Sequence, residues 1–174
     1  MKNLIRLLRY DWPLHFILVF TNWMPDNVLI LKLRGWLCRP FFKKCGKNLR
    51  LGRNITFYNS SKIEIGNDVY IAFNNWLSAG VLITIGDKVN IGPGCVFASG
   101  SHQLKNGNFN DATNYENENI KIESGCWIAA NVNVAGGTTI GKGSLVAAGC
   151  SVKGIYPDEV LIATQIATVK RKLS

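Results

Sequence analysis

Apolar residues recur at every sixth position over much of this 174-residue chain. The longest unbroken series runs through Ile122, Ile128, Val134, Ile140, Val146 and Val152, and shorter series run through Ile65, Ile71 and Leu77 and through Ile85, Ile91 and Phe97. A step of six matches neither an amphipathic helix nor the alternation of a hairpin sheet. It is typical of a parallel β-helix, in which each short strand sends one aliphatic side chain into the core. The chain is therefore predicted to be an all-β solenoid.

Three six-residue sides make one coil, so equivalent positions should recur about every 18 residues. Five segments fit the opening strand of a coil: 49–52, 63–66, 83–86, 120–123 and 138–141. They predict about five coils between Leu49 and Val152. Most of these segments end in glycine, which permits a sharp corner, and Asn or Asp often follows, which tolerates the left-handed conformation. A β-sandwich would produce such a series only by coincidence.

The period divides the chain into three parts. Residues 1–48 should form a helical N-terminal cap, in which Pro25-Asp26 starts a helix from Asn27 to about Leu37. Residues 49–156 should form the β-helix, interrupted by a loop at 98–119. Residues 157–174 are expected to be a C-terminal tail or helix.

Positive charge is concentrated ahead of the repeats. Residues 1–50 contain ten Lys or Arg and two acids, whereas the remaining 124 residues contain ten and nine. Basic residues interleaved with apolar ones suit the surface of an anionic membrane, but the same helices could simply cover the first coil. Both interpretations stay open. The apolar run at 14–20 is too short to span a bilayer, no signal-peptide cleavage site follows it, and the basic residues form no nucleic-acid-binding module.

The five cysteines are odd in number and lack the paired spacing of a metal site. We expect them to be reduced and non-catalytic, in a cytoplasmic protein that is either free or at the inner face of the membrane. Two histidines are too few for a multi-histidine zinc site, so no metal is expected.

The loop at 98–119 is the one large break in the repeat. It is polar and rich in Asn, and His102 stands near its start. Loops that leave a repeat scaffold are frequent places for binding and catalysis. Imidazole can take up a proton near neutral pH, so His102 is the candidate general base. The other histidine, His15, lies in an apolar segment and is expected to be structural.

Three segments resemble a known family. Gly100-Ser101-His102 resembles the loop motif around the catalytic histidine of the colanic-acid branch. Residues 125–132 resemble the coil that follows this loop, and residues 140–152 resemble the last coil, along which the pantetheine arm runs. In these segments the chain is similar to the left-handed β-helix, hexapeptide-repeat acyltransferases, specifically to sugar O-acetyltransferases of the galactoside, maltose and colanic-acid type.

The resemblance implies a left-handed parallel β-helix, assembled as a homotrimer with active sites at the subunit interfaces. It implies transfer from acetyl-CoA to a sugar hydroxyl of a surface polysaccharide or its precursor. His102 would be the general base, and the backbone N–H of Ala130 would stabilise the oxyanion. Acceptor binding is implied for Asn74, Asn75 and Ser101, and cofactor contact for Trp127, Ala130, Ala148, Lys153, Lys170 and Arg171.

The chain departs from the family pattern at two places. The family usually ends with Gly-x-Pro-Ala and a basic residue, whereas residues 163–167 read Ala-Thr-Gln-Ile-Ala; Ala129 also replaces the glycine of Trp-Ile-Gly. Two other functions therefore stay open. One is the same transfer to another acceptor, such as serine, an antibiotic hydroxyl or an amino sugar. The other is a non-catalytic β-helix that serves as an assembly or anchoring module.

Overall fold

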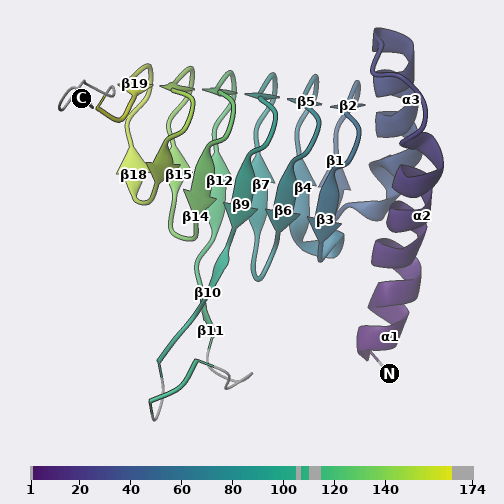
Figure 1. The fold of residues 1–174 in the computed structure, drawn as a ribbon, viewed down its shortest axis with the longest axis horizontal. Coiled ribbons are helices and arrows are strands. Elements are labelled where there is room, and N and C mark those ends of the chain that lie inside the picture. The colour runs from purple at the N-terminus through teal and green to yellow at the C-terminus, as the bar shows by residue number, and fades with distance from the viewer. Residues whose placement is uncertain (1, 105–106, 110–114, 166–174) are drawn as a thin grey trace, which may run out of the picture.

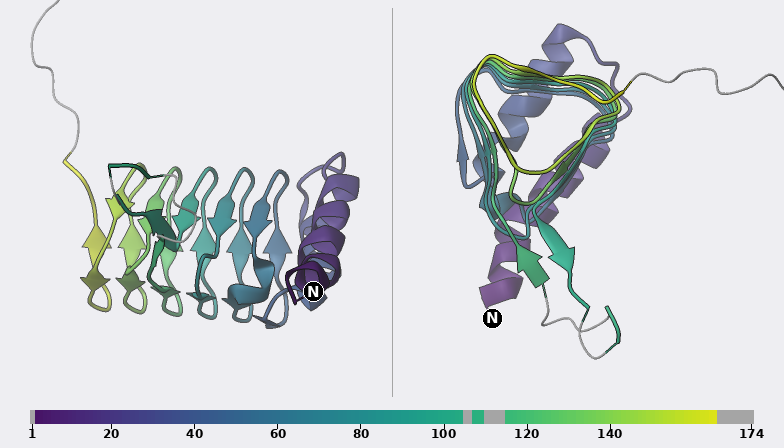
Figure 2. Two further views of the ribbon diagram at one scale, coloured as in Figure 1. Left: turned by 90° about the horizontal axis from the view of Figure 1, so that it is seen from below. Right: turned by 90° about the vertical axis from the view of Figure 1, so that its left-hand side faces the viewer.

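The computed structural model describes residues 2–104, 107–109 and 115–165 and shows a three-sided parallel β-helix with helices at its N-terminal end (Figure 1). Two sides are six-stranded sheets and the third is five-stranded. A view along the axis shows the triangular cross-section, with a two-stranded ribbon leaving one corner (Figure 2). The fold predicted from the six-residue step is confirmed.

Each of the first five coils contributes one strand to each sheet, the last coil contributes one strand to each of two sheets, and the pairing within each sheet is parallel. Sheet A contains β1 (Lys44–Cys45), β4 (Ile63–Ile65), β7 (Ile83–Ile85), β12 (Ile120–Ile122), β15 (Thr139–Ile140) and β18 (Ile155–Tyr156). Sheet B contains β2 (Arg50–Leu51), β5 (Tyr70–Ile71), β8 (Asn90–Ile91), β13 (Trp127–Ile128), β16 (Leu145–Val146) and β19 (Leu161–Ile162). Sheet C contains β3 (Thr56–Tyr58), β6 (Trp76–Ser78), β9 (Val96–Ala98), β14 (Asn133–Ala135) and β17 (Ser151–Val152).

The β-helix has about six coils, one more than the period predicts. It begins with β1, ahead of residue 49, and β19 continues it beyond residue 156. Strand pairing places Cys45 beside Ile65, 20 residues on, but Ile140 beside Tyr156, only 16 residues on. The last turn from sheet C to sheet A is short and contains Gly154 at φ +114°. The six-residue step is lost there, which hides the final coil from the sequence pattern.

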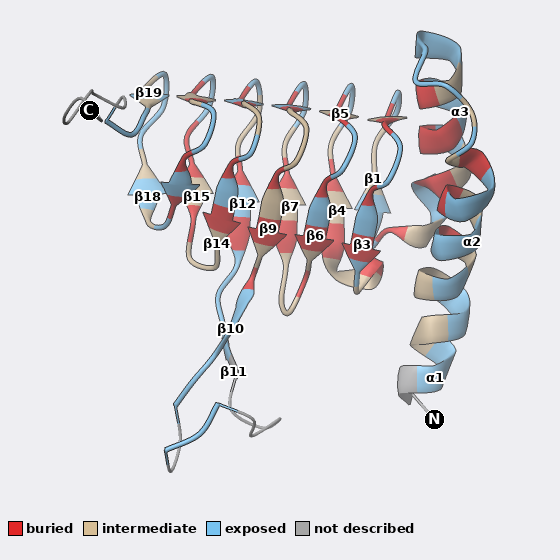
Figure 3. Ribbon diagram, viewed as in Figure 1, coloured by how far each residue is buried: buried red, intermediate tan, exposed pale blue. Residues whose placement is uncertain are grey.

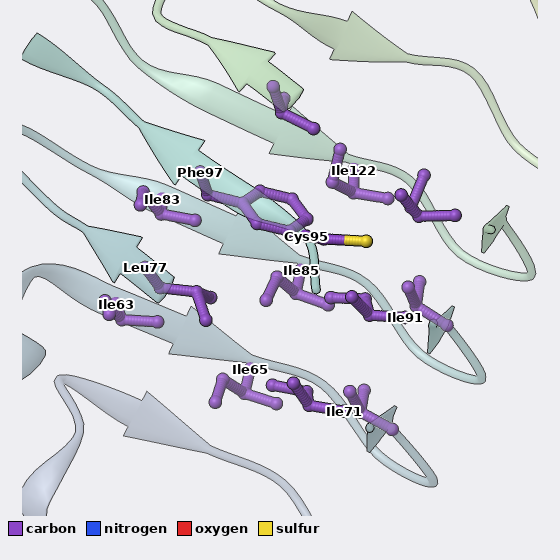
Figure 4. Close-up of a cluster of buried hydrophobic side chains, with 14 of the residues drawn as sticks. Ile63, Ile65, Ile71, Leu77, Ile83, Ile85, Ile91, Cys95, Phe97 and Ile122 are labelled. Carbon is purple, nitrogen blue, oxygen red and sulfur yellow. The ribbon is translucent and has the colours of Figure 1, made fainter. Parts of the chain in front are cut away.

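The core is a stack of aliphatic side chains inside the triangle. Ile63 pairs with Ile83, and Leu77 pairs with Phe97, and all four are fully buried (Figure 4). Burying one such side chain contributes roughly 1.5–3 kcal/mol. Because each residue packs on its equivalents in the coils above and below, the stability of the prism is mainly a sum of contacts between neighbouring coils.

The N-terminal helices cover the open end of the prism. They are α1 (Lys2–Arg6), the π-helical η1 (Leu7–Asp11), α2 (Trp12–Thr21) and α3 (Val28–Cys38), with short 3-10 turns η2 (Arg39–Phe41) and η3 (Ser60–Lys62). As predicted, Asn27 starts α3: its side chain accepts a hydrogen bond of 3.0 Å from the N–H of Ile30. Helix α3 lies so close to the first coil that a Cβ on Gly35 would come within 1.9 Å of the Leu49 carbonyl oxygen.

Arg34 joins this cap to the β-helix. Its guanidinium is fully buried and donates at 2.6 Å to the carbonyl oxygen of Leu51 in β2. It also donates to the hydroxyl and carbonyl oxygens of Thr21, at the end of α2, and to the Asp26 carboxylate at 3.0 Å. One side chain therefore holds two helices, their connection and the first coil. No helix among residues 2–104, 107–109 and 115–165 is both long and apolar enough to cross a membrane.

The loop between coils is partly regular. β10 (Gly100–His102) and β11 (Tyr115–Asn117) pair as an antiparallel ribbon, with His102 opposite Tyr115 (Figure 1). The ribbon follows β9 and precedes β12, so it emerges at the corner between sheets C and A. Its pairing fixes the start of the loop, where His102 lies.

Candidate active site

His102 ends β10 at the point where the ribbon leaves the β-helix. Its side chain is exposed and lines a hollow of about 460 Å³ over the outer face of sheet C. The other lining residues come from sheet C, its corners and the ribbon: Tyr58, Asn59, Trp76, Ser78, Gly80, Ala98, Gly100 and Asn117. The hollow thus combines a group that can exchange a proton with aromatic and polar walls.

Two aromatic side chains give the hollow its apolar surface. Leu77 points into the core, so its neighbour Trp76 on β6 faces outward and is 41% exposed. Tyr58 on β3 is 62% exposed and pairs in register with Ser78. Aromatic faces beside hydroxyl and amide groups are a common way to bind a small polar ligand with an apolar face. The alternation of inward and outward residues could have pointed to this pair, but the period alone does not.

Asn117 lies between two glycines at the base of the ribbon. A Cβ on Gly80 or on Gly100 would come within 2.5 Å of the Asn117 side-chain oxygen. Both positions therefore need glycine if the Asn117 side chain is to keep its place. The Lys62 ammonium donates to the Gly80 carbonyl oxygen and covers the same corner. Sequence analysis did not single out Asn117, because nothing in the repeat marks residues of the returning strand.

Ser101 lies on the opposite side of the ribbon from the hollow beside His102. It lines a smaller hollow of about 120 Å³ together with Glu118 and Lys153. The Ser101 hydroxyl donates to the Glu116 carbonyl oxygen at 3.4 Å, and Lys153 Nζ lies 3.1 Å from a Glu118 carboxylate oxygen. Of the residues expected to bind acceptor or cofactor, Ser101 and Lys153 are therefore neighbours across this small hollow.

Ala130 and Ala148 belong to a column at the corner between sheets B and C. Phe73 and Pro93 occupy the same position in earlier coils. The Ala130 carbonyl oxygen accepts a 2.9 Å hydrogen bond from Gly149, and the Pro93 carbonyl oxygen accepts one from Asn131. Within the described part of the chain, the N–H groups of Ala130 and Ala148 have no backbone acceptor, although their neighbours do. The corner therefore leaves these two donors available to a ligand.

The two asparagines expected to bind acceptor differ in their surroundings. Asn74 is exposed and has φ +58°, the left-handed conformation that Asn131 also adopts in this corner. Asn75 is 1% exposed, and its amide donates to the carbonyl oxygens of Ala72 and Gly92 while accepting from the N–H of Cys95. The Asn75 side chain closes the corner, so Asn74 is the member of the pair that a ligand can reach.

Trp127 lies on sheet B, 54% exposed, beside a hollow of about 260 Å³ that Tyr70 and Asn90 also line. It precedes the Ala130 corner in the same coil. The hollow beside His102 includes neither Trp127 nor Ala130. A single chain thus places the expected site residues in two groups, at the two edges of sheet C. Lys170 and Arg171 lie outside the described residues.

Burial makes the cysteine thiols harder to deprotonate. It raises the pKa of Cys38 to about 12 and that of Cys45 to about 11, and it also raises the pKa values of Cys95 and Cys126. These thiols are poor nucleophiles at neutral pH, as expected for structural cysteines. All five cysteines are free. Among the described residues, no cluster of three or more His, Cys, Asp or Glu could hold a metal ion.

Comparison with known proteins agrees with this architecture. The family described as bacterial transferase hexapeptide (six repeats) matches residues 119–154. WcaF of Escherichia coli (strain K12), which carries the name of a colanic acid biosynthesis acetyltransferase, is 30% identical over 151 residues that cover 86% of this chain and 79% of its own. The chain belongs to the hexapeptide-repeat acetyltransferase family.

This acetyltransferase has two other informative relatives. Galactoside O-acetyltransferase of Escherichia coli (strain K12) is 28% identical over 155 residues, which cover 89% of this chain and 74% of the relative. A hexapeptide-repeat acetyltransferase of Vibrio cholerae O1 biovar eltor, solved in complex with acetyl coenzyme A, is 28% identical with a TM-score of 0.71. That match covers 94% of this chain and 87% of the solved one.

Proposed function

We propose that this protein is an acetyl-CoA-dependent O-acetyltransferase acting on a sugar hydroxyl of a surface polysaccharide or its precursor. The observation that carries the proposal is His102 beside an aromatic and polar hollow in a chain of this family. The relatives support the two substrates: the name of one specifies a galactoside, that of another colanic acid, and a third was solved with acetyl coenzyme A. Trp76 and Tyr58 offer the aromatic surface on which a sugar ring can pack.

In the proposed reaction, His102 takes the proton of the acceptor hydroxyl as its oxygen attacks the thioester carbonyl carbon. The negative charge that develops on the carbonyl oxygen is stabilised by the N–H of Ala130, which has no backbone acceptor within the described part of the chain. Collapse of the tetrahedral intermediate forms the ester and breaks the carbon–sulfur bond, and the proton passes from His102 to the departing CoA sulfur. A positioned general base contributes about 10²–10⁴-fold to such a reaction.

The cofactor would lie along the corner column of Ala130 and Ala148, with Trp127 at its side. Backbone donors spaced one coil apart suit the amides of a pantetheine arm. Lys153, Lys170 and Arg171 are the proposed cations for the phosphates. Lys153 is paired with Glu118 at 3.1 Å, so cofactor binding at Lys153 would require this ion pair to open.

The division of these residues between two edges of sheet C supports a homotrimer with interfacial sites. His102 follows β9, whereas Ala130 precedes β14, so one chain presents the base and the oxyanion donor at different corners. Packing the His102 corner of one protomer against the Ala130 corner of its partner would bring the two groups together. Three such contacts close a ring.

A direct test measures thiol release from acetyl-CoA with a panel of galactosides, other sugars, serine and amino sugars. We expect turnover with a sugar hydroxyl and a loss of about 10²–10⁴-fold in kcat for His102→Ala. His15→Ala is the matched control, since His15 is exposed on α2 and should leave the rate unchanged. Turnover of His102→Ala at the wild-type rate would disprove the mechanism. Failure of acetyl-CoA to raise the melting temperature, together with no turnover of any acceptor, would favour the non-catalytic alternative.

Mixing two inactive variants tests the shared site. Ala130→Pro removes the N–H and adds a ring, and the corner accommodates that ring because Pro93 already occupies the same position one coil earlier. Pro93 therefore shows that this corner can hold a proline. Co-refolded His102→Ala and Ala130→Pro chains should regain up to about a quarter of wild-type activity, as random pairing in a trimer predicts. Sites contained within single chains would give no recovery.

A further inference from the structure

The outer face of the N-terminal cap is strongly apolar. Phe20, Trp23, Leu29 and Trp36 are between 68% and 78% exposed. Further apolar residues of α1, η1, α2 and α3 are also exposed: Leu4, Ile5, Leu8, Trp12, Phe16, Val19, Val28 and Leu33. We call these twelve residues the cap face. Twelve exposed apolar side chains at one end of the protein mark an interaction site, because exposed apolar residues without such a role are usually scattered singly.

The cap face is distinct from the side of the helices that packs on the prism. Leu14 and Leu18 of α2 and Leu31 and Cys38 of α3 are buried toward the first coil. Figure 3 shows the buried side of α3 toward the coils and the exposed side away from them. Within the part of the chain that the structure describes, the packing of the cap on the β-helix therefore leaves the cap face without a partner.

Basic side chains lie beside the cap face at its Trp36 end. Two hollows, of about 320 and 650 Å³, meet at Trp36 and Arg39. Lys32 and Lys47 line the first, and Lys43 and Lys44 line the second. Hollows with an indole and several cations can hold an anionic head group beside an apolar chain.

Most of this positive charge is unpaired. Among the described residues, Lys43 is bridged to Glu64 at 2.9 Å, but Lys32, Lys44 and Lys47 have no acidic partner. Residues 1–50 contain only two acids, and neither pairs with a basic residue that lines these hollows. Asp11 accepts hydrogen bonds from Ser60, and Asp26 is held by Arg34 and Arg53. The cap face and its rim are therefore apolar and cationic.

We propose that the cap face binds the surface of an anionic phospholipid membrane. Aromatic and aliphatic side chains would enter the boundary between head groups and acyl chains, while Lys32, Arg39, Lys44 and Lys47 would contact lipid phosphates. Charge complementarity decides against a second copy of the chain as the occupant. Two cap faces in contact would bring together two cationic rims, with a net charge of +8 in residues 1–50 of each chain.

The position of the cap at one end of the β-helix is compatible with membrane binding. The helices lie across one end of the prism, so the cap face looks away from the coils along their axis (Figures 1 and 2). Protomers packed side by side with parallel axes would present their cap faces in one plane. The hollow beside His102 lies on a side wall of the prism and would stay open above such a membrane.

Co-sedimentation of the full-length protein with vesicles tests the proposal. Phosphatidylcholine vesicles with about a third phosphatidylglycerol should bind the protein, with an affinity that falls as salt rises, and pure phosphatidylcholine should bind at least tenfold more weakly. Lys44→Glu with Lys47→Glu should weaken binding more than tenfold, since each cation near an anionic surface contributes roughly fivefold. Trp23→Ala with Trp36→Ala should weaken it similarly by removing the apolar anchors.

Matched controls separate this site from general charge and hydrophobicity. Lys88→Glu with Lys142→Glu makes the same charge change on the exposed wall of the prism, and Ile155→Ala removes an apolar side chain that is 84% exposed at the far end. Both controls should bind as wild type does, and all variants should keep the wild-type circular dichroism spectrum. Absence of binding to anionic vesicles, equal binding to neutral ones, or an equal loss in the controls would overturn the proposal. So would a tryptophan variant that lowers the oligomeric state, because a second copy would then cover the cap face.

Discussion

The buried guanidinium of Arg34 gives the sharpest prediction about stability. Replacing it with methionine keeps an apolar stem in the same place but removes the guanidinium and every hydrogen bond that it makes. The carbonyl oxygens of Leu51 and Thr21 then lose a donor, and the Asp26 carboxylate loses its shorter ion pair. The attachment of the cap to the first coil should weaken.

The size of the effect follows from burial. Removing one partner of a buried ion pair costs about 3–5 kcal/mol. The lower end applies here, because the Asp26 side chain is 22% exposed and keeps contacts from Arg53 at 3.6 Å and from the Arg53 N–H at 3.2 Å. We therefore expect Arg34→Met to reduce the free energy of unfolding by about 3 kcal/mol and the melting temperature by about 6–12 °C.

Arg53→Ala is the matched control, since Arg53 pairs with the same carboxylate but is 49% exposed. An exposed ion pair contributes about 0–1 kcal/mol, so this variant should melt within about 4 °C of wild type. Urea unfolding followed by far-ultraviolet circular dichroism, at one protein concentration, measures both variants. Equal losses for the two variants, or a loss below about 1 kcal/mol for Arg34→Met, would refute the reasoning from burial.

Two further predictions concern the ribbon and a thiol. Gly100→Ala should shift the melting temperature by no more than about 2 °C. It should lower kcat/KM, because the new Cβ displaces the Asn117 side chain from the hollow beside His102. Unchanged kinetics would show that Asn117 is not part of the site. Cys45, whose pKa burial raises to about 11, should be alkylated by iodoacetamide at pH 8 about a hundredfold more slowly than an unfolded thiol, and the rate should rise until about pH 11. The folded state holds the Cys45 thiol proton more tightly than the unfolded state does. The protonated thiol therefore contributes fully to the free energy of unfolding below the unfolded pKa, and this contribution declines as pH rises from about 9 toward 11.

The β-helix could be predicted because its core imposes one aliphatic residue per six-residue side. Ile65, Ile85 and Ile122 pair in register, and each is also visible in the sequence as a member of the series. The start of the first coil was predicted wrongly, because residues 49–52 hold β2 of sheet B and the coil opens earlier, at β1 in sheet A; the last coil was not predicted at all. Cys45 replaces the usual aliphatic residue in β1, and the turn at Gly154 shortens the last coil.

The burial of Arg34 could not be predicted from the composition of the sequence. In the sequence it is one of ten basic residues ahead of the prism, and such residues are normally exposed. In the structure it is the largest fully buried side chain and binds the cap to the coil. Asn75 gives the same lesson on a smaller scale, because its amide closes a corner at a position where the resemblance implied a ligand contact.

The candidate residues could be proposed from the sequence, but their places in the fold could not. His102 is a candidate because the loop interrupts the period, and Ala130 is one because its coil resembles that of a known family. Their separation at two edges of sheet C could not be found, since it depends on how many corners the chain has turned between them. In a three-sided β-helix each side chain or backbone group stays at the corner where the chain places it. A site that needs groups from two corners of sheet C therefore cannot form within one chain. If the base and the oxyanion donor act on one substrate, assembly is therefore a condition of activity, and dilution that separates the protomers should abolish turnover before the coils unfold.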